Sequence, residues 1–193
     1  KSMKKLMISI LMIGGLLGRT GCIVRDDTTK YKRETRKISE EIVGLEIEDI
    51  SSDIQILSED IEDVLIEYTD SVDEQLYTIE VDNKILKVAK KKTTVNNEES
   101  NVIIKLPSKI YSLISVITTN GDVELNKIKS TVYRCSTENG DIRGILDGKK
   151  KEYSIAVETE NGESNLKDSL ISSENKLEMK TQNGDVDIRF TEE

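Results

Sequence analysis

Thr118-Thr119-Asn120-Gly121-Asp122 is the first of four copies of one short motif in this chain of 193 residues. The later copies are Thr137-Glu138-Asn139-Gly140-Asp141, Thr159-Glu160-Asn161-Gly162-Glu163 and Thr181-Gln182-Asn183-Gly184-Asp185. Successive Asn residues lie 19, 22 and 22 positions apart. Recurrence at a period of about 20 residues indicates one supersecondary unit that is copied and stacked. The chain is therefore predicted to form a repeat architecture, not a globule with an active-site cleft.

Short runs of alternating apolar and polar residues flank every copy. Asn-Gly between such runs is a strong turn signal, because both residues accept a positive φ at little cost. Alternation with a period of two turns one face of each short strand inward. The inward positions before the turns are Ile114, Val116, Tyr133, Cys135, Ile155, Val157, Leu177 and Met179. Those after the turns are Val123, Leu125, Ile142, Gly144, Ser164, Leu166, Val186 and Ile188, of which only Gly144 and Ser164 are not apolar.

Two arrangements of the copies are compatible with this pattern. Four hairpins would give an antiparallel meander or a β-sandwich with four similar turns. Four coils of a solenoid would stack equivalent residues about 4.8 Å apart, so that Thr, Asn, Gly and Asp form ladders along the axis. Only stacking gives a reason for Thr two places before every Asn. We therefore predict an all-β, single-domain β-solenoid, similar to a parallel β-helix, with the meander or sandwich as the alternative.

A weaker copy of the pattern precedes the four clear ones. Placing Ser51 at the Asn position aligns Leu45, Ile47, Ile54 and Ile56 with the inward positions, which predicts a first coil. Further strands are predicted at 64–68, 76–81, 85–88 and 102–107, with a turn at 82–84 and the only Pro closing the last strand. The first three make a hairpin-rich N-terminal cap, and the charged tail 189–193 is the expected cap at the other end.

Together the repeats resemble the family of putative adhesin domains found in bacterial envelope proteins. The resemblance rests on the recurring apolar-x-apolar-x-Thr-x-Asn-Gly-Asp-apolar-x-apolar pattern and on the strand that ends in Leu106-Pro107, and it covers about residues 38–193. It implies a β-solenoid domain outside the cytoplasmic membrane and no assigned catalytic residue. The third copy departs from the pattern at Glu163 and Ser164, which predicts a looser coil.

Residues 1–22 have the pattern of an export signal. Lys4 and Lys5 precede an apolar run from Leu6 to Leu17, which is too short to span a bilayer comfortably but typical of a signal-peptide core. Gly21-Cys22 follows and looks like a bacterial lipoprotein cleavage site, at which Cys22 becomes the lipid-bearing residue. Arg19 stands where such sites usually carry an aliphatic residue. An uncleaved anchor and ordinary secretion therefore remain alternatives to lipidation of Cys22.

Residues 23–37 are rich in charge and nearly free of apolar side chains, which predicts a solvated tether before a domain at 38–193. The whole chain has a net charge of −9. The first 22 residues carry +4 and the tether carries +3, so the remaining domain carries −16. An acidic domain is repelled by nucleic acid and by anionic lipid. We expect no nucleic-acid partner. The expected contacts are the membrane, through the lipid or signal anchor, and an envelope protein or polymer.

The composition excludes several kinds of catalytic site. The chain contains no His, which excludes Ser-His-Asp and Cys-His nucleophiles and His metal sites. One Phe and no Trp leave little material for a stacking platform. If Cys22 is acylated, Cys135 is the only remaining thiol, and its inward position predicts an inert core residue. No catalytic residue is predicted.

The column Asp122, Asp141, Glu163 and Asp185 is the strongest candidate for a ligand site. Stacked carboxylates repel one another, and Ca²⁺ would relieve the repulsion because it binds several oxygens. Alternatively, an Asp that follows Gly in a turn accepts hydrogen bonds from nearby backbone N–H groups. The glycine-rich pattern of calcium-binding β-rolls is missing. We therefore predict no metal and no other cofactor. If the protein binds Ca²⁺ after all, these four carboxylates are the candidate ligands.

The predicted function is that of a non-enzymatic, membrane-tethered envelope protein outside the cytoplasm. It would act as an adhesin that presents a repetitive acidic β surface to a protein or polymer. The alternative is an envelope accessory or stress-sensing component that contacts a membrane protein or the cell wall. A third class, a hydrolase with two carboxylates from the acidic column, lacks a visible cleft loop.

Overall fold

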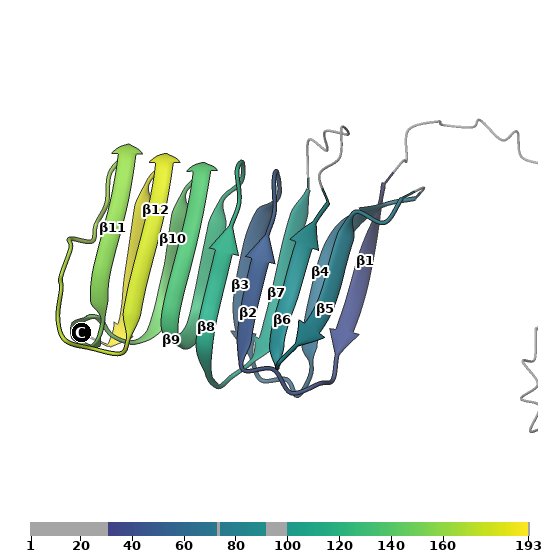
Figure 1. The fold of residues 1–193 in the computed structure, drawn as a ribbon, viewed down its shortest axis with the longest axis horizontal. Helices are drawn as coiled ribbons and strands as arrows, with labels where there is room; N and C mark the ends of the chain where they lie inside the picture. The colour runs from purple at the N-terminus through teal and green to yellow at the C-terminus, as the bar shows by residue number, and fades with distance from the viewer. Residues whose placement is uncertain (1–30, 73, 92–99, 193) are drawn as a thin grey trace, which may run out of the picture.

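The computed structural model describes residues 31–72, 74–91 and 100–192. The predicted signal peptide, Cys22 and the first eight residues of the predicted tether lie outside them. The described residues form 13 β-strands and one short 3-10 turn, η1 (Lys150–Glu152). No helix among them is long and apolar enough to cross a membrane. The prediction of a single all-β domain is confirmed (Figure 1).

The strands form one mixed sheet that folds into two facing layers (Figure 1). Layer one contains, in spatial order, β5 (Tyr77–Asp82), β6 (Ile85–Lys90), β2 (Gly44–Glu48), β8 (Ile110–Ile117), the second half of β9 (Val123–Asn139), β12 (Lys176–Asn183) and β11 (Ser154–Asn161). Layer two contains β1 (Tyr31–Ile38), β4 (Val64–Ser71), β7 (Asn101–Pro107), β3 (Asp53–Glu59), the first half of β9, β10 (Ile142–Lys149) and β13 (Val186–Glu192). The long strand β9 joins the layers.

Each Asn-Gly motif is a corner at which the chain passes from layer one to layer two. We call one layer-one strand, its corner and the following layer-two strand a rung. Neighbouring repeat rungs pair in parallel and in register, so that Asn139 lies opposite both Asn120 and Asn183. The parallel stacking predicted for a solenoid is therefore present, and the hairpin meander is wrong for the repeats.

The rungs do not follow one another in chain order, in which the fold differs from the parallel β-helix to which the predicted solenoid was likened. In space β2 lies between β6 and β8, and β12 lies between β9 and β11. The Asn ladder consequently runs Asn120, Asn139, Asn183, Asn161. The third copy is the one that departs from the motif, and it takes the end of the stack, where one side has no neighbouring rung to match.

The N-terminal part is a cap of antiparallel strands, as predicted. Strands β5 and β6 form a hairpin whose two loop residues, Asn83 and Lys84, have φ values of 51° and 63°. The tether prediction needs correction at its end, because 31–37 belong to β1, which pairs with β4. Charged side chains on β1 suit an edge strand, and Arg33 bonds Glu67 at 2.9 Å.

The predicted C-terminal cap lies at the expected end of the stack, but as part of β13, the last strand of layer two, which pairs with β10. The loop after the third motif covers this end. The Asn165 side chain accepts from Ile188 N and donates to Ile188 O, both at 3.0 Å, so its amide imitates a further strand on β13. Asp168 Oδ1 likewise accepts from Val157 N at 2.9 Å on the free edge of β11.

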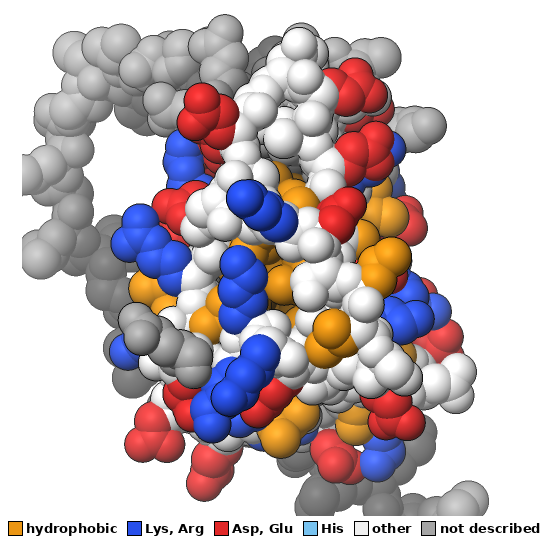
Figure 2. Space-filling view, turned by 90° about the vertical axis from the view of Figure 1, so that its left-hand side faces the viewer, with side chains coloured by type: hydrophobic (Ala, Val, Ile, Leu, Met, Phe, Trp, Pro, Cys, Tyr) orange, Lys and Arg blue, Asp and Glu red, His pale blue; other side chains and the backbone are white. Residues whose placement is uncertain are grey.

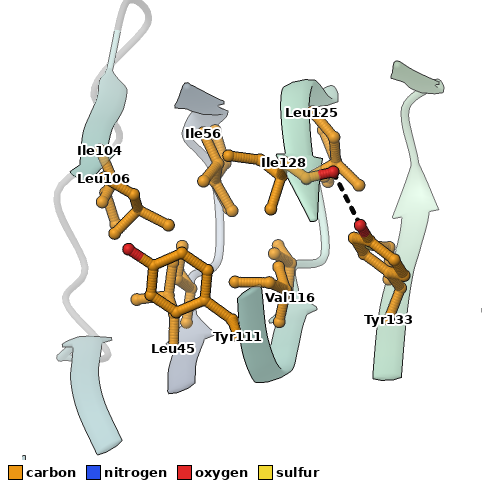
Figure 3. Close-up of a cluster of buried hydrophobic side chains, with 14 of the residues drawn as sticks. Leu45, Ile56, Ile104, Leu106, Tyr111, Val116, Leu125, Ile128 and Tyr133 are labelled. Atoms are coloured by element: carbon orange, nitrogen blue, oxygen red, sulfur yellow. Dashed lines mark hydrogen bonds between the residues drawn. The ribbon is translucent and has the colours of Figure 1, made fainter. Parts of the chain in front are cut away.

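The core lies between the two layers and contains the residues at most of the predicted inward positions (Figure 3). Val157, Gly144 and Ser164 are the exceptions, because each is only half-buried. Leu45, Ile47, Ile54 and Ile56 of the weak first copy are at most 1% exposed, which confirms that alignment. Tyr133 also points inward, and its hydroxyl donates to Ile128 O at 2.8 Å (Figure 3). Burial of each such side chain contributes about 1.5–3 kcal/mol. The packed interior leaves function to the corners, edges and outer faces.

Candidate functional site

The most regular polar feature of the molecule is the row of Asn-Gly corners. Asn139 Nδ2 donates to Asn120 Oδ1 at 2.9 Å, and Asn183 Nδ2 donates to Asn139 Oδ1 at 2.8 Å. Asn161 Nδ2 completes the series by donating to Asn183 Oδ1 at 2.9 Å. Each amide thus satisfies the next, because identical side chains repeat at the spacing of the rungs. The Asn ladder expected from the sequence is present, in a different order.

Gly completes each corner and a Thr hydroxyl completes three of them, whereas the buried Thr118 hydroxyl has no hydrogen-bond partner among the described residues. The hydroxyl of Thr181 donates to Gly140 O at 2.9 Å, and that of Thr137 donates to Gly121 O at 3.2 Å. The glycines are required by close approach: a Cβ atom at Gly121, whose φ is 144°, would lie 2.2 Å from Ser52 O. At Gly140 it would lie 2.2 Å from Gly121 O. Gly162 and Gly184 occupy equivalent places in their corners.

The acidic column is part of the same corners and is engaged with the backbone. Asp122 Oδ1 accepts from Asp141 N at 2.8 Å, and Asp141 Oδ1 accepts from Asp185 N at 2.7 Å. Asp185 Oδ1 then accepts from Glu163 N at 2.8 Å, and Asp53 Oδ1 starts the series by accepting from Asp122 N. The Asp side chains thus accept hydrogen bonds from backbone N–H groups, which was the alternative to calcium binding. The bonds run between neighbouring rungs.

Calcium binding has little support in this arrangement. One oxygen of Asp122, Asp141 and Asp185 is already held by an N–H group, and Arg143 pairs with both Asp122 and Asp141. Over the described ranges no group of three or more acidic or Cys side chains is arranged to hold a metal ion. Three of the four calcium candidates, Asp122, Asp141 and Asp185, therefore stabilise corners through their side chains, whereas Glu163 contributes its backbone N–H. With the neighbouring acidic residues of this edge, these carboxylates form an acidic row.

A second polar site, which sequence reasoning missed, occupies the corner of the weak first copy. Asp49, whose side chain is fully buried, accepts three backbone N–H groups on Oδ1, from Ile50, Ser51 and Ser52 at 2.7–2.9 Å. The hydroxyl of Tyr77 donates to Asp49 Oδ2 at 2.8 Å. At this corner one carboxylate accepts the hydrogen bonds that stabilise the turn, whereas the repeated motif stabilises the other corners.

Lys90 reaches into this site from β6. Its Nζ lies 3.8 Å from Asp49 Oδ1 and donates to the hydroxyls of Ser51, Ser52 and Ser100 at 2.9–3.2 Å. Burial lowers the pKa of Lys90, whereas the charge of Asp49 opposes that shift. In some enzymes a serine hydroxyl acts as the nucleophile and a neighbouring lysine acts as its base. However, Ser52 is 0% exposed, so no substrate reaches its hydroxyl, and the cluster is structural.

Cys135 is inert, as its inward position predicts. The side chain is buried, and burial raises the pKa of the Cys135 thiol to about 12. It lies beneath a shallow groove of about 580 Å³ on the outer face of layer one. Ion pairs Arg134–Glu178 and Lys180–Glu158 cross this groove, and Ile117 is exposed beside them. The groove combines these charges with a mainly apolar lining that includes Ala156, Val157 and Met179, and it offers no set of groups suited to catalysis.

The end of the stack beyond β11 exposes apolar side chains. Leu170 is 85% exposed and Ile171 41% in the loop whose Ser169 pairs with Ile155 of β11. Figure 2 looks onto this end and shows apolar and basic side chains in the middle, with acidic ones toward the margins.

Comparison with solved structures identifies the fold. A protein from Clostridium sporogenes, described as a "putative cell adhesion protein", shares 16% identity with a TM-score of 0.56, over 84% of this chain and 100% of that one. A "putative adhesin" from Bacteroides fragilis shares 13% identity with a TM-score of 0.41, over 81% of this chain and 97% of that one. No match was found among curated proteins.

The family assignment follows from the sequence itself. The model of the Toastrack DUF4097 family matches residues 42–192, which includes every repeat rung and most of the N-terminal cap. The strands seen side by side from β11 to β1 in Figure 1 form its mixed, curled sheet. The chain belongs to the Toastrack DUF4097 family.

Proposed function

We propose that the protein is a non-enzymatic module of the bacterial envelope, tethered outside the cytoplasmic membrane, that works by contact with a protein or polymer. The observation that carries the proposal is the exposed acidic row on a rigid edge. Its carboxylates belong to Asp53, Asp122, Glu138, Asp141, Glu160, Glu163 and Asp185, of which Asp122 and Asp141 are half-buried and paired with Arg143. Because each corner is fixed by its neighbours, the row presents charge at regular intervals of about 4.8 Å.

Adhesion is the contact role that we propose first. The similar Clostridium sporogenes protein is described as a putative cell adhesion protein, and the acidic row and the end face with Leu170 provide two surfaces for such contacts. The signal peptide and lipidation at Cys22 stay predictions from the sequence. Together they would place the domain on the outer side of the membrane.

One structural observation favours the accessory role as a second candidate. Because β1 begins at Tyr31, only residues 23–30 separate the predicted lipid-bearing Cys22 from the folded domain. Eight fully extended residues reach about 29 Å at most. A tether of that length suits a partner near the membrane, such as a membrane protein or the inner part of a wall, better than another cell.

The two roles are separated by protease accessibility on intact cells, compared with cells stripped of their wall and with cells that make the Cys22→Ala variant. Under the adhesin role the domain is cleaved on intact cells, and the variant is shed into the medium. Protection until the wall is removed would replace adhesion by the accessory role. Protection in both preparations would contradict the proposed location itself.

A further inference from the structure

The edge opposite the Asn-Gly corners is rich in lysine, although the domain is strongly acidic. At this edge the chain passes from layer two back to layer one, at the corners β7–β8, mid-β9 and β10–β11. These three corners carry Lys109, Lys127, Lys129, Lys149, Lys150 and Lys151, which we call the lysine edge. Neighbouring strands are about 4.8 Å apart, so the ammonium groups are spread along the stack.

Part of the lysine edge borders a groove of about 370 Å³. Lys109, Lys127 and Lys129 line it together with Ser108, Thr191 and the carboxylate of Asp147. The Thr191 hydroxyl donates to Asp147 Oδ1 at 2.9 Å and the Ser108 hydroxyl donates to Glu59 O at 3.0 Å, so the ammonium groups are the donors left for a ligand. Lysine ammonium groups commonly bind phosphate oxygens. The groove is therefore chemically suited to a phosphate group.

Few of these charges are neutralised. Lys129 lies 3.8 Å from Asp147, and Lys149 lies 3.1 Å from Glu192. The ammonium of Lys109 donates to a backbone carbonyl, Ile42 O, at 2.7 Å, and keeps its charge. Among the described residues no ion pair is formed by Lys127, Lys150 or Lys151. Excess positive charge therefore remains on this edge, available to an anion.

The backbone of Lys127 gives independent support. Its φ of 54° is in the left-handed region, where a residue other than Gly, Asn or Asp is uncommon. A long basic side chain at this strained corner projects beside the groove, which is a common arrangement at binding sites.

We propose that the lysine edge binds a linear polymer of phosphodiester-linked polyol units, with successive phosphates at successive corners. The inference deepens the proposed function, because it names the polymer that an envelope module would contact. It rests on the proposed function only in assuming that the protein and the polymer are both outside the cytoplasmic membrane. Binding is electrostatic and should weaken steeply with salt, because each phosphate contact releases counterions.

Two other anionic partners fit less well. Proteins usually hold a single-stranded nucleic acid by stacking its bases on aromatic side chains, and Tyr111, the aromatic residue next to Ile110 at this edge, is 1% exposed. A membrane surface is disfavoured because the chain enters the domain on the other side. Tyr31, the first residue of β1, lies opposite Ser71 at the Asn-Gly edge. The lysine edge thus faces away from the chain entry.

The test measures binding of fluorescently labelled poly(glycerol phosphate) to the purified full chain, at low and at physiological salt. The edge variant is Lys127→Glu with Lys129→Glu, and Lys150→Glu with Lys151→Glu is a second version in case the first fails to fold. The matched control, Lys87→Glu with Lys180→Glu, makes the same charge change on the outer face of layer one. All proteins share the same N-terminal basic residues.

We expect either edge variant to bind about tenfold or more weakly, and the control to stay within about twofold of the unmodified chain. Equal losses in edge and control variants, or no binding by the unmodified chain, would overturn the inference. So would equal displacement by polyglutamate, or binding of single-stranded DNA or anionic vesicles in place of the polymer. Binding by a chain found inside the cell would contradict the proposed location and leave the inference intact.

Discussion

The corner of the weak first copy and the corners of the four clear copies are stabilised by different sets of hydrogen bonds. In the clear copies Asn, Thr and Asp of one rung bond to the equivalent rung beside it. At the first copy Asp49 instead gathers three N–H groups and a tyrosine hydroxyl, with Lys90 beside it. One solution spreads the hydrogen bonds over many identical residues, and the other concentrates them on a single buried carboxylate.

This difference predicts how each region responds to substitution. Loss of one member from a repeated ladder leaves the remaining corners intact and exposes the affected groups to water. Loss of Asp49 leaves Lys90 buried without its counter-charge, and an unpaired buried charge is far more costly than an unpaired surface amide. The N-terminal network should therefore be the more fragile of the two regions.

The largest expected effect follows from Asp49→Ala. Removing this carboxylate should lower the free energy of unfolding by about 3–5 kcal/mol, because buried donors and the Lys90 ammonium lose their acceptor. Urea denaturation of the purified chain measures this loss. Asp53→Ala is the control, since Asp53 is exposed and accepts one N–H group, from Asp122. It should cost about 0.5–1.5 kcal/mol, and equal losses in both variants would remove the distinction between the regions.

Gly121→Ala should have the next largest effect. Its Cβ atom would meet Ser52 O at 2.2 Å, so the two rungs must separate, and we expect a loss of about 3 kcal/mol. Gly148→Ala isolates the backbone contribution, because Gly148 also has a positive φ, of 131°, but its Cβ would meet nothing closer than 3.9 Å. It should cost about 1 kcal/mol, measured by the same denaturation. Comparable losses would show that close approach between rungs is unimportant.

Much of this fold could be predicted from the sequence because the repeats are local and periodic. The inward positions, the parallel stacking and the place of Ser51 at an Asn position all follow from the alternation and the motif. The order of the rungs does not, because near-identical motifs pair equally well with any copy. Only the long loop after Glu163 and the imperfect third copy distinguish the end rung from the others.

The sites that sequence reasoning missed lack such local signals. Asp49 and Lys90 are far apart in the sequence and meet only because β2 and β6 are neighbours in layer one. Tyr31–Ile38 carries the charge of a tether, and only its pairing with β4 shows that it is an edge strand. The lysine edge is similar, since its lysines come from three separate corners and the domain as a whole is acidic.

The smallest expected effect is that of removing one amide from the ladder. Asn139 donates to Asn120 and accepts from Asn183, so Asn139→Ala should lower the free energy of unfolding by about 1 kcal/mol. Asn161 stands at the end of the ladder and makes one amide bond, to Asn183, so Asn161→Ala should cost about half as much. Thermal denaturation ranks the two variants. A larger loss at Asn161 would place it inside the ladder and contradict the spatial order.

The order of the rungs is the central structural claim, and disulfide cross-linking tests it most directly. In a chain with Cys22→Ser and Cys135→Ala, the pair Asn139→Cys and Asn183→Cys is compared with the pair Asn139→Cys and Asn161→Cys. Neighbouring corners are close enough for a disulfide, which needs Cα atoms about 4.4–6.8 Å apart. Mass spectrometry after mild oxidation should find the intramolecular disulfide in the first pair and free thiols in the second. A disulfide between positions 139 and 161 would show that the rungs follow chain order and would contradict this account.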